Sequence, residues 1–118
     1  MYEDVTAVNG FPMLFDSENM DVLTGSAHHF ERSIRKLHAL ENVLYQPDAA
    51  DPQLPAYYLF YPQALPEPAR EALDSLNLTY SLVMMPSLLV GDEFVKTSGH
   101  YHPFLQGTTL GYPEVYTQ

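Results

Sequence analysis

The sequence contains no cysteine and no tryptophan. Without cysteine the chain cannot form a disulfide, a zinc–thiolate site or a cysteine nucleophile. A metal ion in this protein would therefore have to be held by histidine, aspartate, glutamate or backbone oxygen. A reducing compartment is compatible with this composition, although the composition does not require one.

Positive charge is also scarce. Five lysines and arginines stand against 15 aspartates and glutamates, so the formal net charge is −10. A net negative charge repels phosphodiester backbones and anionic lipid headgroups. We therefore expect no nucleic acid and no membrane surface among the partners.

Long apolar runs are missing as well. No segment approaches the roughly 18 consecutive apolar residues of a membrane span, and two acidic residues stand where a signal peptide would carry positive charge. These features predict a cytoplasmic protein that is not exported. The 118 residues suffice for one compact domain and are too few for two.

The ten prolines and nine tyrosines favour short extended segments and turns. Residues 1–27 alternate short apolar pieces with turn formers such as Asn9-Gly10, which predicts an irregular or strand-like arm. A helical pattern follows, for which Ser26 is a good N-cap. We predict a helix over residues 28–41, because five apolar residues recur at the spacing of one helix face, namely Phe30, Ile34, Leu37, Leu40 and Leu44.

The C-terminal half is expected to be rich in β structure. AYYLFY, residues 56–61, and LTYSLVMMP, residues 78–86, predict strands, and a short helix is expected within residues 66–76. Gly91-Asp92 predicts the turn of a hairpin whose second strand covers residues 93–101.

The stretch TSGHYHP carries the strongest chemical signal. Residues i and i+2 of a strand point to the same face, so His100 and His102 can bind one cation. Glu114 follows a stretch containing two glycines, which is long enough to bring a carboxylate back from a neighbouring strand. Two imidazoles and a carboxylate suit Fe(II), Mn(II), Zn(II) or Ni(II). The His-x-His spacing alone is a weak signal, because an exposed pair in a loop is unremarkable.

VKTSGHYHP followed by GYPEVY resembles the first motif of the cupin-type phosphoglucose isomerases of archaea and some bacteria. The family pattern is approximately TKGHYH, a variable loop and then PE-x-Y-x-V-L-x-G. The match runs through Tyr116, with Ser98 in place of the usual lysine. Upstream, SIRKLHALENVL is similar to the family's basic helix, and AYYLFY and LTYSLVMMP resemble strands between that helix and the motif.

The resemblance implies a mainly β fold: a cupin (double-stranded β-helix, jelly-roll) barrel, here incomplete, preceded by an N-terminal arm and one α-helix. It implies a single truncated domain over residues 1–118. Residues 1–55 would form the arm and helix, and residues 56–118 the first barrel strands with the metal motif. A second motif, with a histidine as fourth ligand, would lie beyond residue 118. Family members are dimers, so a homodimer is expected.

The activity implied is the interconversion of glucose 6-phosphate and fructose 6-phosphate, a step of glycolysis and gluconeogenesis. By resemblance His100, His102 and Glu114 bind the metal, commonly Fe2+, with Mn2+, Ni2+ and Zn2+ as alternatives. Glu114 is also the candidate catalytic base, acting through an enediol, and a hydride shift is the competing mechanism. The substrate-binding positions implied are Thr97, Gly99, Tyr116 and Tyr58.

A hydroxyl residue usual in the family aligns near Val83, where Ser81 or Thr79 are possible substitutes. Two other kinds of function stay open. The chain could be a non-catalytic truncated remnant that binds metal or sugar phosphate, or another cupin sugar isomerase or epimerase. The remaining histidines, His28, His29 and His38, are interpreted as solvated or packing residues.

Overall fold

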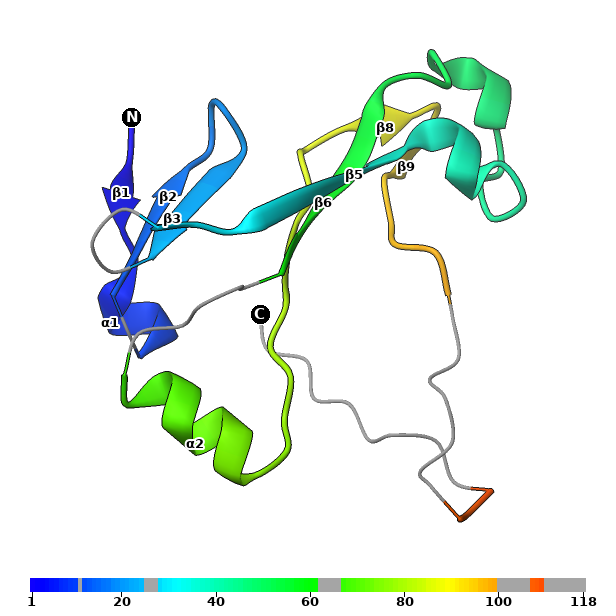
Figure 1. Ribbon diagram of the computed structural model, residues 1–118. Coiled ribbons are helices and arrows are strands. Elements are labelled where there is room, and N and C mark those ends of the chain that lie inside the picture. Colours follow the sequence, from blue (N-terminus) through cyan, green and yellow to red (C-terminus); the bar gives the residue numbers. More distant parts are fainter. Residues whose placement is uncertain (11, 25–27, 62–66, 100–106, 110–118) are drawn as a thin grey trace.

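The computed structural model describes residues 1–10, 12–24, 28–61, 67–99 and 107–109 (Figure 1). Within these ranges the chain is mainly β, with three antiparallel sheets, two short α-helices and two 3-10 helices. The strands of the described residues do not close into a barrel. None of the helices among these residues has the length and apolar character that a membrane span needs.

The N-terminal arm folds into a four-stranded sheet, which we call sheet A. Its strands are β1 (Glu3–Asp4), β2 (Met13–Asp16), β3 (Asp21–Thr24) and β4 (His28–His29), in that spatial order. Helix α1 (Thr6–Asn9) precedes β2 and ends at Gly10, whose φ of 87° is the left-handed conformation that glycine adopts without strain. The prediction of a strand-like arm is confirmed.

Sheet B contains the longest strand of the described residues. It consists of β5 (Glu31–Lys36), β6 (Pro55–Tyr61) and β7 (Leu82–Met84), with β6 in the middle. The 3-10 helices η1 (Leu37–Leu40) and η2 (Pro47–Ala49) lie between β5 and β6, and α2 (Ala69–Ser75) lies between β6 and β7. The strand predicted from AYYLFY and the helix predicted within residues 66–76 are both confirmed.

Sheet C is a hairpin of β8 (Leu89–Val90) and β9 (Glu93–Phe94). Its turn contains Gly91, with φ of 64°, so the predicted turn at Gly91-Asp92 is confirmed. The predicted strand over residues 93–101 is too long, because β9 ends at Phe94. The reason is that β8 has only two residues and offers no longer partner.

The helix predicted over residues 28–41 is wrong. The chain instead runs through β4, Phe30 and β5 before a single 3-10 helix begins at Leu37. Phe30 packs with sheet A, Leu37 and Leu40 pack on the other side of β6, and Ile34 is 42% exposed. The apolar residues thus have helical spacing without sharing one face.

Tertiary pairing explains why a strand forms there. Residues from Glu31 to Arg35 pair one to one with the aromatic strand β6, from Glu31 opposite Tyr61 to Arg35 opposite Tyr57. This pairing satisfies the backbone groups of β5 that face β6 and overrides a helical preference, which contributes only a few tenths of a kcal/mol per residue. Both faces of β5 are mostly polar and exposed, so it lacks the alternation that identifies a strand in a sequence.

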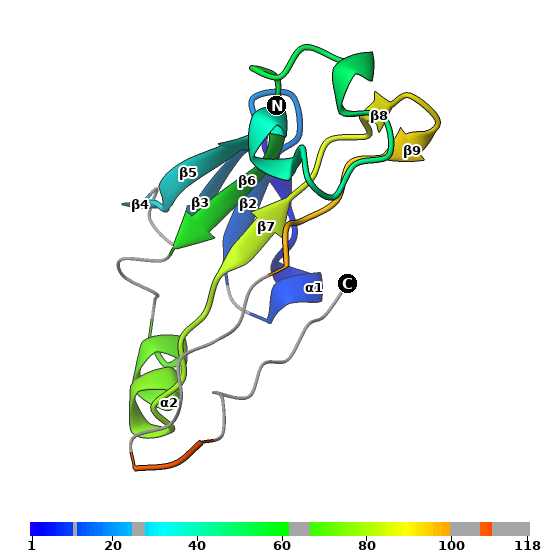
Figure 2. The ribbon, with the colours of Figure 1, turned by 90° about the vertical axis from the view of Figure 1, so that its right-hand side faces the viewer.

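The hydrophobic core divides into two clusters on the two faces of β6. The hairpin-side cluster contains Leu37, Leu40, Leu44, Ala56, Tyr57, Val90 and Val95. The arm-side cluster contains Met13, Val22, Phe30, Phe60 and Met84. Figure 2 shows the arm-side arrangement, with β2 and β3 packed behind sheet B. Because β6 is covered on both faces, it is the structural centre of the molecule.

A β-bulge alters the alternation at the start of β6. Lys36 pairs with Pro55 and Arg35 pairs with Tyr57, so Ala56 is the extra residue. Ala56 and Tyr57 consequently both belong to the hairpin-side cluster. The bulge therefore determines which of the two adjacent tyrosines, Tyr57 or Tyr58, faces the hairpin.

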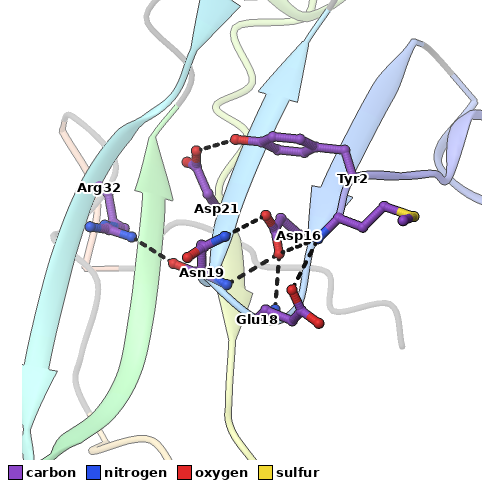
Figure 3. Close-up of polar contacts among 7 residues, drawn as sticks. Tyr2, Asp16, Glu18, Asn19, Asp21 and Arg32 are labelled. Atoms are coloured by element: carbon purple, nitrogen blue, oxygen red, sulfur yellow. Dashed lines mark hydrogen bonds and ion pairs between the residues drawn. The ribbon is translucent and has the colours of Figure 1, made fainter.

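The turn between β2 and β3 is organised by Asp16, which is only 3% exposed (Figure 3). One carboxylate oxygen accepts the Asn19 side-chain amide at 2.8 Å, and the other accepts the N–H groups of Glu18 at 3.0 Å and Asn19 at 3.2 Å. These bonds, the Asn19 side chain first, lower the pKa of Asp16 from 3.8 to about 2. The charged carboxylate therefore stabilises the turn.

We expect Asp16→Asn to lower the thermal unfolding midpoint at pH 7. A pKa depressed in the folded state contributes stability that is present above the unfolded pKa of 3.8 and is lost as the pH falls toward 2. The difference between parent and variant should therefore shrink between those pH values. Asp74→Asn, in an exposed side chain of α2, is the control. A difference that stays constant with pH would contradict this role.

Candidate functional site

Residues 95–99 lead directly into the histidines of TSGHYHP, and we call them the anchored segment. Val95 is 8% exposed and belongs to the hairpin-side cluster. Its backbone N–H donates to the carbonyl of Leu88 at 2.9 Å. The segment is therefore attached to the core at its first residue.

Lys96 provides a second anchor on the surface. Its ammonium group lies 2.9 Å from a carboxylate oxygen of Glu93 and 5.5 Å from the ring centroid of Tyr45. Glu93 also accepts the backbone N–H of Tyr45. The hydrogen bond from Lys96 is the main cause that lowers the pKa of Glu93, followed by the bond from Tyr45. The charge of Lys96 is thus engaged within the protein.

Ser98 provides the third anchor. Its Oγ lies 3.2 Å from the hydroxyl oxygen of Tyr57, whose side chain is in the middle strand of sheet B. Tyr57 is 4% exposed, and Ser98 is half-buried. This contact joins the anchored segment to the structural centre of the molecule.

Thr97 and Gly99 alternate with the anchoring residues and are exposed. In the described part of the chain, no atom other than those of its chain neighbours lies within 4 Å of the position that a Cβ on Gly99 would occupy. Because both residues are exposed, a ligand can approach this stretch of the chain. The predicted substrate positions Thr97 and Gly99 lie together on an accessible stretch of chain.

Tyr58 lies elsewhere. It pairs with Met84 and packs against the arm-side cluster, on the face of sheet B opposite to that of Tyr57. The structure does not bring Tyr58 to Thr97 and Gly99. Tyr57, which is not among the predicted site residues, is the tyrosine that contacts this segment. The sequence does not indicate this contact, because the bulge at Ala56 cannot be read from it.

The ring of Tyr58 lies beneath Arg32, whose guanidinium carbon is 5.6 Å from the ring centroid. One nitrogen of Arg32 donates to the backbone carbonyls of Asn19 and Met20, each at 3.0 Å. Figure 3 shows Arg32 reaching from β5 to the β2–β3 turn. Arg32 therefore links sheets A and B.

We expect Arg32→Ala to lower the free energy of unfolding by about 1 kcal/mol, because two hydrogen bonds and one cation–π contact at a partly solvated site are lost. Urea denaturation measures this change. Arg35→Ala, an exposed arginine on the same strand, is the matched control and should change stability by less. Equal effects of the two substitutions would show that Arg32 acts only through its charge.

The remaining predicted site residues are His100, His102, Glu114 and Tyr116, and they lie outside the described residues. Their roles stay predictions. Among the residues that the structure does describe, no group of three histidines or carboxylates is arranged to hold a metal ion. The chemistry of the predicted donor set, two imidazoles and a carboxylate, fits Fe2+ or Mn2+.

The predicted hydroxyl position near Val83 also has a defined place. Val83 pairs with Leu59 and packs against the hairpin-side cluster, so it shares a face of sheet B with Tyr57. Thr79 and Ser81 are exposed and precede β7. Val83 itself contributes apolar packing at this position.

A pocket of about 150 Å³ lies between η1 and η2. Its ionisable lining residues are His38, Glu41 and Asp48. None of the predicted site residues lines it, and it belongs to the loop that covers the hairpin-side cluster.

Comparison with protein families decides which proteins this chain is related to. The model of the glucose-6-phosphate isomerase (GPI) family matches residues 34–118, more than two thirds of the chain. The chain belongs to this family. The resemblance to the cupin-type phosphoglucose isomerases is thereby confirmed. In this glucose-6-phosphate isomerase relative, the match begins within β5 and includes the anchored segment. Searches of curated proteins and of solved structures returned no match.

Proposed function

We propose that this chain interconverts glucose 6-phosphate and fructose 6-phosphate with a divalent metal ion bound at His100, His102 and Glu114. Membership of the glucose-6-phosphate isomerase family supports the reaction. The structural observation that supports this assignment is the geometry of the anchored segment. It leaves Thr97 and Gly99 exposed directly before His100 in the sequence.

The roles of the chain's own residues follow from their chemistry. The Thr97 hydroxyl and the Gly99 N–H are hydrogen-bond donors that can bind phosphate oxygens without adding charge. Glycine at position 99 leaves room for the ligand at the backbone. Lys96 is paired with Glu93, so these neutral donors, rather than a free ammonium group, are assigned to the phosphate.

In the proposed reaction Glu114 removes the proton from C2 of glucose 6-phosphate and returns it to C1. A second proton moves from the C2 hydroxyl to the C1 oxygen, so that the enediol becomes fructose 6-phosphate. When bound, the metal ion would polarise the substrate oxygens. In the competing mechanism, hydride moves directly from C2 to C1 and Glu114 serves only as a ligand.

A coupled isomerase assay with added Fe2+ or Mn2+ tests the proposal. We expect slow turnover that EDTA abolishes, because the described strands do not enclose the anchored segment in a barrel. Activity that survives EDTA would overturn the metal assignment. Saturable binding of metal and sugar phosphate without turnover would favour the binding-module alternative.

The homodimer is proposed from the family resemblance. Among the described strands, β5 and β7 form the two edges of sheet B, and β5 carries Arg32, Arg35 and Lys36, which discourage edge pairing. Light scattering with size-exclusion chromatography measures the molecular mass. A mass near 27 kDa, twice the 13.4 kDa of one chain, would support the dimer.

A further inference from the structure

The hydroxyl contact between Tyr57 and Ser98 connects a buried core residue to a segment with exposed residues. Tyr57 lies in the middle strand of sheet B, and its ring is packed within the hairpin-side cluster. Ser98 is two residues before His100 in the sequence. Among the hydrogen bonds between described residues, no other involves a residue that precedes His100 so closely. The support for the segment that enters the histidine motif therefore comes from the core.

The position of Ser98 gives this contact a specific consequence. Its two chain neighbours are Thr97 and Gly99, the exposed residues proposed to bind the phosphate, and His100 follows Gly99. Lys96 fixes the segment on the upstream side of Thr97 through Glu93. The Tyr57 hydroxyl fixes it on the downstream side, so Thr97 lies between two anchors.

The ring and the hydroxyl of Tyr57 have separable roles. The ring fills space between neighbours such as Leu37 and Val95 in the hairpin-side cluster, which phenylalanine would do equally well. The hydroxyl is within hydrogen-bond distance of a single described side chain, that of Ser98. A buried polar group of this kind is strengthened by its low-dielectric surroundings and costs stability when it loses its partner.

We propose that Tyr57 is a positioning residue for the metal and phosphate site. Its hydroxyl holds Ser98, and with it the exposed neighbours Thr97 and Gly99 that directly precede the proposed ligand His100. This inference rests on the proposed function, because it assumes that TSGHYHP binds the metal. It assigns a role to a residue on β6, distant in sequence from the motif.

The test is a double-mutant cycle of Tyr57→Phe and Ser98→Ala, read out by Co2+ titration followed through the visible absorption of the ion. Each single variant should weaken Co2+ binding about fivefold, the loss of one hydrogen bond. The double variant should be no weaker than either single variant, because both remove the same contact. Ser98→Thr, which keeps a hydroxyl, should restore the parent affinity.

Tyr45→Phe is the matched control. Tyr45 is 89% exposed and contacts Lys96 through its ring, which phenylalanine retains. Its Co2+ affinity should equal that of the parent. Ser98→Ala is a second route to the same answer if Tyr57→Phe folds poorly, because Ser98 lies outside both core clusters.

The outcomes separate this inference from the proposed function. If the parent binds Co2+ and Tyr57→Phe and Ser98→Ala both retain its affinity, the positioning role is wrong and the proposed function stands. If the two single losses add fully in the double variant, the residues act independently and the positioning role is again wrong. If the parent does not bind Co2+, the proposed function fails and this inference fails with it.

Discussion

Replacing Phe60 with alanine is expected to lower the free energy of unfolding by about 3–5 kcal/mol. Phe60 is 0% exposed and is the largest of the fully buried side chains. It lies in the middle strand of sheet B and packs with Met13 and Val22 of the arm and with Phe30. Its loss would remove apolar contacts with sheet A and leave a cavity between the two sheets.

Phe94→Ala is the matched control for this substitution, because the Phe94 side chain is 68% exposed. It should lower the free energy of unfolding by about 1 kcal/mol or less. Urea denaturation followed by far-ultraviolet circular dichroism measures both variants. Since small domains are stabilised by only about 5–15 kcal/mol, this loss is a large fraction of the total stability, and the urea midpoint of the Phe60 variant should fall far more than that of the Phe94 variant. Equal midpoints for the two variants would contradict the arm-side packing.

Replacing either His100 or His102 with alanine is expected to weaken divalent metal binding by about 100-fold or more. Each histidine would supply one of only three proposed protein ligands from this chain. Even mutation of residues that merely hydrogen-bond to metal ligands commonly lowers metal affinity 10–100-fold. Isothermal titration calorimetry with Mn2+ measures the change. His38→Ala, in an exposed histidine of η1, is the control and should retain the parent affinity.

The pH dependence of metal binding gives an independent check on the same ligands. Imidazole binds metal only when neutral, so affinity should fall as the pH drops through the usual histidine pKa of about 6.5. A chain that binds metal only through its surface carboxylates would retain affinity to about pH 4–5. Affinity that is unchanged between pH 7.5 and 5.5, or that is lost in His38→Ala, would contradict the assignment.

The sequence predicts those elements whose signals are local. AYYLFY is aromatic and lies between turn formers, and it forms the central strand β6. Gly91-Asp92 forms the turn of a hairpin because glycine adopts the positive φ of 64° that the turn requires. These features depend on neighbouring residues alone, so they can be predicted without knowledge of the fold.

Elements that depend on partners distant in sequence are harder to predict. The segment from Phe30 to Leu44 has apolar residues at helical spacing, yet pairing with β6 makes Glu31–Lys36 a strand. The choice between Tyr57 and Tyr58 depends on the bulge opposite Arg35 and Lys36, which has no local signature. The motif residues could be identified from resemblance, whereas the contact that supports them could only be found in three dimensions.

Paramagnetic broadening by Mn2+ tests the central claim most directly. In a ¹⁵N-labelled sample, substoichiometric Mn2+ should first broaden the amide signals of Thr97, Ser98 and Gly99, because the proposed ligand His100 follows them in the chain. The competing sites in a chain of net charge −10 are its surface carboxylates. Broadening that begins instead in the Asp16 turn or around Glu41 and Asp48, with residues 97–99 unaffected, would contradict a metal site at TSGHYHP.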